Sequence, residues 1–571
     1  MKKLINAPAA VVREMLEGAV AVAPDQAVLA DETVVVRRPL PDAAQAGGKP
    51  WPVAVLSGGG AGHEPAHGGY VGQGMLAAAV AGNVFTSPSV DAVLAGLRAV
   101  TSPSGAVMVV KNYTGDRLNF GLAAELMRAE GVPVEVVVVA DDVALRGTVE
   151  PARRRGIAGT VLVHKVAGAA AAAGLPVGEV AALARQAAAN LGSMGVALAG
   201  CTLPGAARGG FDLADDEIEL GLGIHGEPGV RRTPMQPADA LVGTMLATIT
   251  EDLALRPGEQ VALLVNGLGA TPAMELDIVL RAALARLRAD GIAVVRAWRG
   301  TFLSALDMAG CSISVMRLDG RLLELLDAPT DAPAWPGAGL LNMHVVLPPA
   351  PAAPPAAPGP VEPGSAAVRR AAIAAANALI AAEAQLTDLD TRAGDGDLGA
   401  SMVRAGQAVL ALPDAAWASP AGALAAMGDA LRRAVGGSSG PFYATALLRA
   451  SRSLGAGGTS PDGWAAAFAA GVQAVSELGG ARPGDRTMVD ALAPASDALS
   501  AALAKGVAPA EALRAAAAAA RNGAEATASM QPRLGRSSYL GDRALGIPDG
   551  GAVAVAVWLE AVSAAAMGEQ A

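Results

Sequence analysis

A run of prolines near the middle of the chain is the feature that most constrains its fold. Eight prolines fall between residues 348 and 363, in the stretch LPPAPAAPPAAPGPVEPGS that starts at Leu347. Proline lacks a backbone N–H and fixes φ, so this run cannot enter a helix or sheet interior and favours an extended, semi-rigid spacer. A chain of 571 residues also exceeds what one hydrophobic core usually supports. We therefore predict two parts, residues 1–346 and 366–571, joined by a linker at 347–365.

The two parts differ in their sequence patterns. Before the proline run, Val- and Ile-rich stretches such as PVAVLSGGG, GAVMVVKNYTGD and VALLVNGLGAT alternate with helical patterns. Buried strands separated by helices indicate a largely parallel or mixed α/β sheet, and the region near 180–200 is expected to divide this part into two α/β lobes. After residue 366, Ala- and Leu-rich segments are broken by loops rich in Gly, Pro and Asp, which indicates an all-α domain.

Composition and charge exclude several classes of protein. The formal net charge of −10 leaves no basic surplus to neutralise the phosphates of a nucleic acid. A proline and several charged residues interrupt the first twenty residues, so no signal peptide is indicated, and the longest alanine runs are too short and too weakly apolar to cross a membrane. Cys201 and Cys311 are isolated, which favours buried free thiols in a reducing compartment. The sequence predicts a cytoplasmic protein without nucleic-acid or membrane partners.

Two of the five histidines lie in dense glycine frames. His63 lies in SGGGAGHEPAHGG and His225 in GLGIHGEPG, and the frames predict that bulk near each imidazole is not tolerated. The stretch KNYTGD adds Lys111 and Asp116 after a strand predicted at 107–110. These residue types together can orient a small polar substrate and move protons, and neutral imidazole can attack a carbonyl carbon. We expect a ligand site here. Glu227, beside His225, could orient the ring or serve only the turn.

Other features of the first part are weaker signals. The triplet at 58–60 follows a strand predicted at 53–56, where it could be a phosphate cradle or a tight turn. No G-K-[ST] follows it, so a nucleotide P-loop is not indicated. His67 and His164 lack a comparable setting, and we interpret them as structural.

An acidic loop is the main signal of the second part. Asp390, Asp395 and Asp397 lie in LTDLDTRAGDGDLGASM, interspersed with glycines. Spacings of five and two cannot place three carboxylates on one face of a regular helix, so we expect a helix that ends, a tight loop and a new helix. Such a cluster can bind Mg²⁺ together with phosphate oxygens. A solvated loop of Asx turns is the alternative.

Several long motifs of the first part, taken together, closely resemble the substrate-binding domain of dihydroxyacetone kinases. They are SGGGAGHEPAHGGYVGQGML, NYTGDRLNFGLAAE, GTVLVHKVAGAAA, GVALAGCTLPG and ELGLGIHGEPG, and the resemblance runs to about residue 340. It implies that His225 binds the carbonyl carbon of the substrate as a hemiaminal, so that the substrate is what comes close to this ring. It also implies acid–base or hydroxyl-contacting roles for His63 and Asp116. The positions that would line the substrate are Gly60, Ala61, Gly62, His63, Lys111 and Asp116, and Ala61 departs from the usual serine.

The second part resembles the nucleotide domain of the same family over about 366–565. That domain is a helical barrel in which ATP binds at one end with two Mg²⁺. The resemblance implies that Asp390, Asp395 and Asp397 hold the metal ions. It further implies phosphate contacts from Ser438 and Ser439 in VGGSSGP, and a nucleotide loop that contains Arg536 and Asp549. Two departures, Leu398 and Ile547, replace polar residues that are usual in the family.

The resemblance therefore implies an ATP-dependent dihydroxyacetone kinase that uses Mg²⁺ and forms a homodimer. An α/β half with two lobes would bind the ketose, and an all-α helical barrel would bind the nucleotide. The presence of both domains in one chain favours ATP dependence, because the phosphotransferase-coupled relatives usually keep them on separate chains. A kinase for erythrulose or glyceraldehyde is one alternative. A ketone-sensing regulator without turnover is another.

Overall fold

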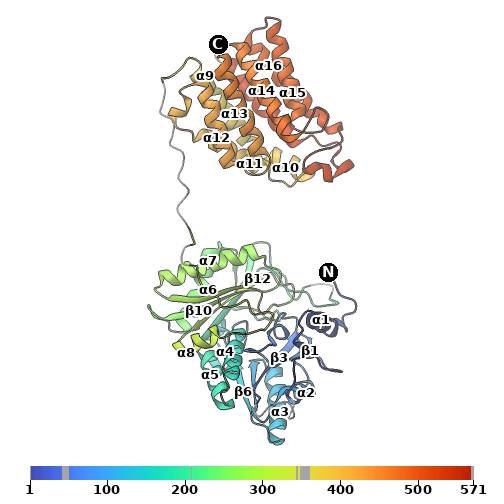
Figure 1. Ribbon diagram of the computed structural model, residues 1–571, viewed down its shortest axis with the longest axis vertical. Helices are drawn as coiled ribbons and strands as arrows, with labels where there is room; N and C mark the ends of the chain where they lie inside the picture. Colours follow the sequence, from blue (N-terminus) through green and yellow to red (C-terminus); the bar gives the residue numbers. More distant parts are fainter. Residues whose placement is uncertain (1, 42–50, 207–208, 343–344, 347–359, 568–571) are drawn as a thin grey trace. The chain divides into compact units, whose positions relative to one another are not determined.

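The structure is a computed structural model that describes residues 2–41, 51–206, 209–342, 345–346 and 360–567 (Figure 1). The chain divides into two compact units, Met1–Pro348 and Pro349–Ala571. The linker predicted at 347–365 lies largely outside the described residues. The first unit is α/β with two sheets and the second is all-α, so the predicted fold class is confirmed.

The first sheet of the α/β unit is mixed. Its strand order is β1-β2-β4-β3-β5-β6, with β4, β3, β5 and β6 parallel and the β1–β2 and β2–β4 pairs antiparallel. Valines and alanines in β3 and β5 are buried along the whole of each strand, as the apolar runs predict. The strands are β1 (Gln26–Val28), β2 (Val34–Arg37), β3 (Ala54–Ala61), β4 (Ala78–Val84), β5 (Ala106–Lys111) and β6 (Val134–Val139).

The second sheet begins at Leu191, within the region where a division into lobes was expected. Its order is β11-β10-β12-β7-β8-β9, and only the β10–β11 pair among these neighbours is parallel. The sequence pattern did not distinguish this largely antiparallel sheet from the first, because strands buried on both faces carry the same apolar runs. The strands are β7 (Leu191–Ala197), β8 (Glu217–Leu220), β9 (Arg231–Pro234), β10 (Gln260–Gly267), β11 (Ala293–Gly300) and β12 (Gly310–Arg317).

Helices cover the sheets and complete the hydrophobic cores. Successive residues of β3 contribute to different cores, because side chains alternate along a strand: Val55 packs in the core that includes α4, and Leu56 in the core with α2 and α3. Residues of α6 and α7 pack with the second sheet. The helices are α1 (Val11–Val20), α2 (Val90–Val100), α3 (Thr114–Ala129), α4 (Thr160–Ala172), α5 (Val177–Ala189), α6 (Ala238–Asp252), α7 (Ala273–Ala289) and α8 (Gly320–Asp327).

The glycine triplet at 58–60 is part of β3 and not the loop that we expected after residue 56. A Cβ at Gly58 would lie 2.3 Å from the carbonyl oxygen of Val80 on β4, and one at Gly60 would lie 2.8 Å from the backbone of Phe85. The missing side chains therefore let β4 and the residues after it approach β3 closely. The strand continues to Ala61, so His63 lies two residues after its end.

The second unit is a closed ring of helices. Consecutive helices from α11 to α17 pack side by side, α9 packs against α11, and α17 packs back against α9 (Figure 1). The described residues 360–567 contain no strand, as predicted. The helices are α9 (Ser365–Ala381), α10 (Glu383–Ala393), α11 (Leu398–Leu410), α12 (Pro420–Ala434), α13 (Ser439–Gly457), α14 (Pro461–Gly479), α15 (Val489–Ala504), α16 (Pro509–Ala526) and α17 (Gly550–Met567).

The ring encloses a cavity of about 700 Å³ with apolar walls, to which Leu424, Trp464 and Leu513 contribute. In the part of the chain that the structure describes, α17 is long and apolar enough to cross a membrane, and α9 with α10 forms a bent pair that passes the same test. Trp558 and Leu559 of α17 also line the cavity. The apolar composition of α17 thus matches its place in the wall of the barrel.

Candidate active site

The first unit brings the predicted histidines together. His63 follows β3 and His225 follows β8, and their Nε2 atoms lie 3.1 Å apart. The other ring nitrogen of His63 lies 2.8 Å from the carbonyl oxygen of Ser304, and that of His225 lies 3.0 Å from Oε1 of Glu227. A carbonyl and a carboxylate can only accept, so both Nδ1 atoms carry hydrogen. The short contact between the Nε2 atoms is then a hydrogen bond only if the pair holds one additional proton.

The two rings have different electrostatic surroundings. Burial, and then the charges of Lys111 and His225, hold the pKa of His63 well below its usual value. Burial alone would raise the pKa of Glu227, but the hydrogen bond and charge of His225 lower it to about 2. His225 therefore lies between the Glu227 carboxylate, which can balance a positive charge, and His63, whose own pKa is well lowered.

The two His-Glu-Pro motifs use their glutamates differently. Glu227 accepts from the backbone N–H of His225 at 2.8 Å as well as from its ring, so it serves both the turn and the imidazole. Glu64 instead accepts from the backbone N–H of Gly62, at 3.0 Å, and the ring of His63 is held by Ser304. The same His-Glu-Pro sequence thus gives His225 a charged hydrogen-bond partner, Glu227, and leaves His63 with a neutral one, the carbonyl oxygen of Ser304.

The glycine frame around His225 makes room for the protein's own atoms. A Cβ at Gly223 would lie 2.1 Å from Oε2 of Glu227 and 2.8 Å from Nη1 of Arg155. Arg155 also binds Asp142 through Nε, at 2.8 Å, and donates to the carbonyl oxygen of Gly221 at 2.7 Å. We expected the substrate to be what excludes bulk here, but the Glu227 carboxylate and the Arg155 guanidinium already require that space.

Two aromatic rings hold His225 from the sides, and the sequence analysis missed both. Tyr113 and Phe85 present their rings edge-on to the imidazole, with centroid distances of 4.7 Å and 5.1 Å. Phe85 also stacks on His63 at 5.1 Å. Its φ of 58° is unfavourable for a bulky residue, and such strain concentrates at functional sites. Tyr113 is part of the NYTGD motif that we noted, whereas Phe85 follows β4 without a sequence signal.

Lys111 and Asp116 both lie close to Gly59. Lys111 ends β5 and Asp116 lies in the first turn of α3, and both side chains are buried. A Cβ at Gly59 would lie 2.5 Å from Nζ of Lys111 and 3.5 Å from Oδ2 of Asp116. Ser87 donates a hydrogen bond to Oδ1 of Asp116. The carboxylate therefore has one oxygen held by a hydroxyl and the other near the ammonium.

The remaining predicted residues of this site contribute backbone more than side chains. The methyl group of Ala61 belongs to the core on the α4 side, and its carbonyl oxygen accepts from the N–H of Phe85 at 2.9 Å. A Cβ at Gly62 would lie 2.9 Å from the Phe85 ring. Gly60 and Gly62 thus allow Phe85 to approach, and Ala61 supplies no hydroxyl.

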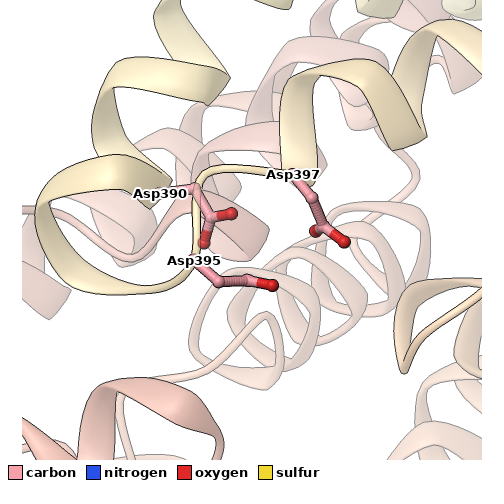
Figure 2. A group of neighbouring side chains, drawn as sticks. All are labelled: Asp390, Asp395 and Asp397. Carbon is pink, nitrogen blue, oxygen red and sulfur yellow. The ribbon is translucent and has the colours of Figure 1, made fainter. Parts of the chain in front are cut away.

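The acidic loop of the second unit gathers its three carboxylates (Figure 2). Asp390 lies in the last turn of α10, Asp395 in the loop and Asp397 at the N-terminal cap of α11, as the spacing predicts. One carboxylate oxygen of each lies within 4.8 Å of the others. The backbone N–H of Leu398 donates to Oδ2 of Asp390 at 3.1 Å. Two of the three side chains are exposed, so this donor set suits Mg²⁺, which takes a few carboxylates and completes its shell with phosphate oxygens and water.

Other predicted nucleotide residues lie at helix starts. Ser438 is the N-terminal cap of α13 and Ser439 its first residue, where backbone N–H groups favour phosphate. Asp549 is half-buried and accepts from the N–H of Ala552 in the first turn of α17. Burial raises its pKa to about 6, which the charge of Arg486 opposes and the charges of Asp490 and Asp390 reinforce. Arg536 begins a short 3-10 helix, Arg536–Tyr539, and its side chain lies outside the described part.

Two domain families match the chain: the Dak1 domain over residues 17–334 and the DAK2 domain over residues 392–564. Among solved structures, the dihydroxyacetone kinase of C. freundii in complex with AMP-PNP and Mg²⁺ is similar over 99% of each chain, with 34% identity and a TM-score of 0.65. The chain belongs to the dihydroxyacetone kinase family. It is 42% identical to human triokinase/FMN cyclase, over 98% of both chains. It is 38% identical to a D-erythrulose kinase of Mycolicibacterium smegmatis, over 99% of this chain and 98% of the relative.

The two departures from the pattern of dihydroxyacetone kinases fill apolar space near the acidic loop. A Cβ at Gly550 would lie 2.7 Å from Cδ2 of Leu398, so Leu398 packs against the start of α17. Ile547 is buried against Leu389 and Ala393 of α10. Both side chains thus support the backbone around the carboxylates and leave the carboxylates in place.

Proposed function

We propose that this chain is an ATP-dependent kinase that phosphorylates a terminal hydroxyl of dihydroxyacetone and releases dihydroxyacetone phosphate. The observation that carries the proposal is the His225–His63 pair, with Nε2 atoms 3.1 Å apart, in the same unit as buried Lys111 and Asp116. A nucleophile, a proton carrier, a base and a cation are together in one site. Family membership supports the kinase reaction, with ATP and Mg²⁺ as cofactors.

Capture of the ketone begins with the shared proton. The additional proton between the two Nε2 atoms moves onto Nε2 of His63, which frees the lone pair of His225 for attack. A C–N bond forms to the carbonyl carbon, the π electrons move to oxygen, and that oxygen takes the proton from His63. The product is a hemiaminal on a positively charged imidazolium whose Nδ1–H remains bonded to Glu227.

Phosphoryl transfer then needs a positioned hydroxyl and a base. Asp116 accepts the proton of the terminal hydroxyl, and the ammonium of Lys111 steadies the charge near it. Asp390, Asp395 and Asp397 would hold the metal ions of the nucleotide. Bound Mg²⁺-ATP supplies the transferable phosphoryl group and neutralises the charge that develops on it. The covalent bond fixes the ketose, so positioning contributes much of the rate.

The identity of the ketose and the assembly are further parts of the proposal. The similar D-erythrulose kinase of M. smegmatis favours erythrulose as a second candidate, since hemiaminal formation requires a carbonyl and not a particular chain length. Glyceraldehyde fits the same chemistry. A regulator without turnover is less well supported, because it would not need the three-carboxylate loop. We also propose a cytoplasmic homodimer.

One experiment separates these candidates. Purified full-length protein is mixed with Mg-ATP and with dihydroxyacetone, erythrulose, glyceraldehyde or glycerol, and ADP release and the intact mass of the protein are measured. We expect turnover of the carbonyl compounds and a covalent adduct in the absence of nucleotide. An adduct without turnover would identify a regulator, and the absence of both would refute the proposal.

A further inference from the structure

Lys111 and His67 form a buried pair at the back of the proposed substrate site. Nζ of Lys111 lies 2.9 Å from Nε2 of His67, and the two residues are 1% and 6% exposed. His67 precedes the 3-10 helix Gly68–Tyr70, so it comes from a different element than Lys111 at the end of β5. Two positive charges at this distance in a buried setting repel strongly. One of the two groups is therefore neutral.

The neighbouring charges make His67 the neutral member. Burial lowers the pKa of Lys111, but the negative charge of Asp116 acts in the opposite direction. Burial, and then Lys111, His164 and His63, all lower the pKa of His67, well below its usual value. No carboxylate hydrogen-bonds to His67 in the described part of the chain. Lys111 thus carries the proton and donates to Nε2 of His67.

The next ring behind His67 is also neutral. The hydroxyl of Ser57 donates to the carbonyl oxygen of Val109 at 2.6 Å, so it accepts from Nε2 of His164 at 3.0 Å. Nδ1 of His164 then carries no hydrogen, and burial lowers the pKa of this residue to about 3. Tyr70, tilted against His164, donates to the carbonyl oxygen of Phe302. The side of His67 away from Lys111 therefore offers no charge to compete for the ammonium.

We propose that His67 is a positioning residue for Lys111: its neutral imidazole accepts a hydrogen bond from the ammonium and holds that charge beside Asp116. The role of His67 rests on the proposed function, in which Asp116 is the base at the substrate hydroxyl. Protonation of His67 would bring two cations into contact and displace the ammonium. The arrangement therefore works only while His67 is neutral.

The pH dependence of the reaction follows from this contact. A hydrogen-bond acceptor favours the charged form of a lysine and raises its pKa. Removing the acceptor lowers the pKa of a lysine that burial already lowers, so the ammonium is lost at a lower pH. Asp116, His63 and the Gly58 carbonyl oxygen, which accepts from Nζ of Lys111 at 3.4 Å, stay as they are in the wild type, and His164 is neutral, so none of these groups replaces the lost acceptor. At high pH, kcat/KM for the ketose should fall as the Lys111 ammonium is lost. This alkaline limb of the pH profile should move to lower pH when the acceptor is removed.

The test compares His67→Leu with His67→Gln in the full-length protein. Leucine removes the acceptor, whereas the glutamine amide oxygen can keep it. We expect the alkaline limb to move down by about one pH unit in His67→Leu, with a raised KM for the ketose and an unchanged KM for ATP. His67→Gln should return the limb toward its wild-type position. His164→Gln is the matched control, and its limb should not move.

A second measurement does not depend on turnover. The chain has six lysines, so the ε-carbon resonance of Lys111 in ¹³C-lysine-labelled protein can be assigned with Lys111→Arg and followed against pH. Its midpoint should be lower in His67→Leu than in the wild type. Equal midpoints in wild type and His67→Leu would overturn the role of His67 even if the wild type phosphorylates none of the ketoses. Where there is turnover, equal pH profiles in the wild type, His67→Leu and His67→Gln would overturn it as well. If His67→Leu does not fold, His67→Met takes its place.

Discussion

Replacing Glu227 by glutamine tests whether a fixed negative charge, and not merely a hydrogen bond, prepares His225 for attack. The amide oxygen of glutamine can still accept from Nδ1 of His225, which lies 3.0 Å from Oε1 in the present structure. The substitution therefore keeps the shape and the hydrogen bond, and it removes the negative charge beside the His225 ring. Glu64→Gln is the matched control, because Glu64 occupies the same place in the other His-Glu-Pro motif but contacts the backbone of Gly62.

The size of the effect follows from the pKa of Glu227. The difference between its ordinary value of 4.5 and about 2 corresponds to roughly 3 kcal/mol, at about 1.4 kcal/mol per pH unit. The side chain is 33% exposed, and solvent screening reduces this to about 1–2 kcal/mol. Because the folded-state pKa is lowered, this stabilisation is present above pH 4.5 and is lost as the pH falls toward 2. The stability difference between wild type and Glu227→Gln should therefore vanish in that range.

The same charge stabilises the positively charged ring of the proposed hemiaminal. We expect the equilibrium constant for adduct formation to fall by about five- to thirtyfold in Glu227→Gln, which corresponds to the same 1–2 kcal/mol. The assay is a ¹³C spectrum of dihydroxyacetone labelled at the carbonyl carbon, mixed with full-length protein at pH 7.5 without nucleotide. Equal adduct in Glu227→Gln and wild type would refute the reasoning, as would an equal loss in Glu64→Gln.

Three further predictions follow from the two sites. His225→Ala should abolish the covalent adduct, measured by intact mass, and leave the protein folded, with a stability loss of about the same 1–2 kcal/mol as Glu227→Gln because it removes the same contact; a persistent adduct would exclude this nucleophile. Asp395→Asn and Asp397→Asn should each lower kcat severely and raise the Mg²⁺ concentration needed for half-maximal rate, because an amide lacks the carboxylate charge; unchanged Mg²⁺ dependence would reduce the loop to a turn. Glycerol should be phosphorylated at least hundreds of times less efficiently than dihydroxyacetone at pH 7.5, since sites that require a bonding group can reject an analogue by ~10⁴-fold; comparable kcat/KM values would show that His225 does not select the substrate.

The sequence predicted the architecture where a local pattern determines it. Alternation of apolar strands with helices gave the α/β class of the first unit, and the spacing of Asp390, Asp395 and Asp397 gave a helix, a loop and a helix. Strand direction in the second sheet was not predictable, because it depends on which strands become neighbours and not on their composition. The glycine triplet was predicted to lie in a loop because its role also depends on neighbours in space. Glycine is needed at positions 58 and 60 because β4 and Phe85 approach the strand closely there, and the local sequence does not show this.

The chemical environment of each predicted site residue was the part that sequence could not supply. Both His-Glu-Pro motifs looked equivalent, yet one glutamate binds its neighbouring imidazole and the other binds backbone. His67 was interpreted as structural because it lacks a sequence setting comparable to those of His63 and His225, and its contact with Lys111 comes from a residue 44 positions away. Such contacts are set by tertiary packing, so residue type and spacing predict them only where a family pattern already records them.

The glycine frames show what a sequence pattern can predict about a site and what it cannot. Dense glycine correctly predicts that side chains are excluded near His63 and His225, because a Cβ at Gly223 or Gly62 would collide with its surroundings. It does not predict what excludes them. At Gly223 the excluding atoms are the Glu227 carboxylate and the Arg155 guanidinium, and at Gly62 they include the Phe85 ring. The frames therefore preserve the groups that set the charge and orientation of the two imidazoles. A substitution at Gly223 should for this reason disturb the His225–Glu227 pair before it obstructs the entry of any substrate.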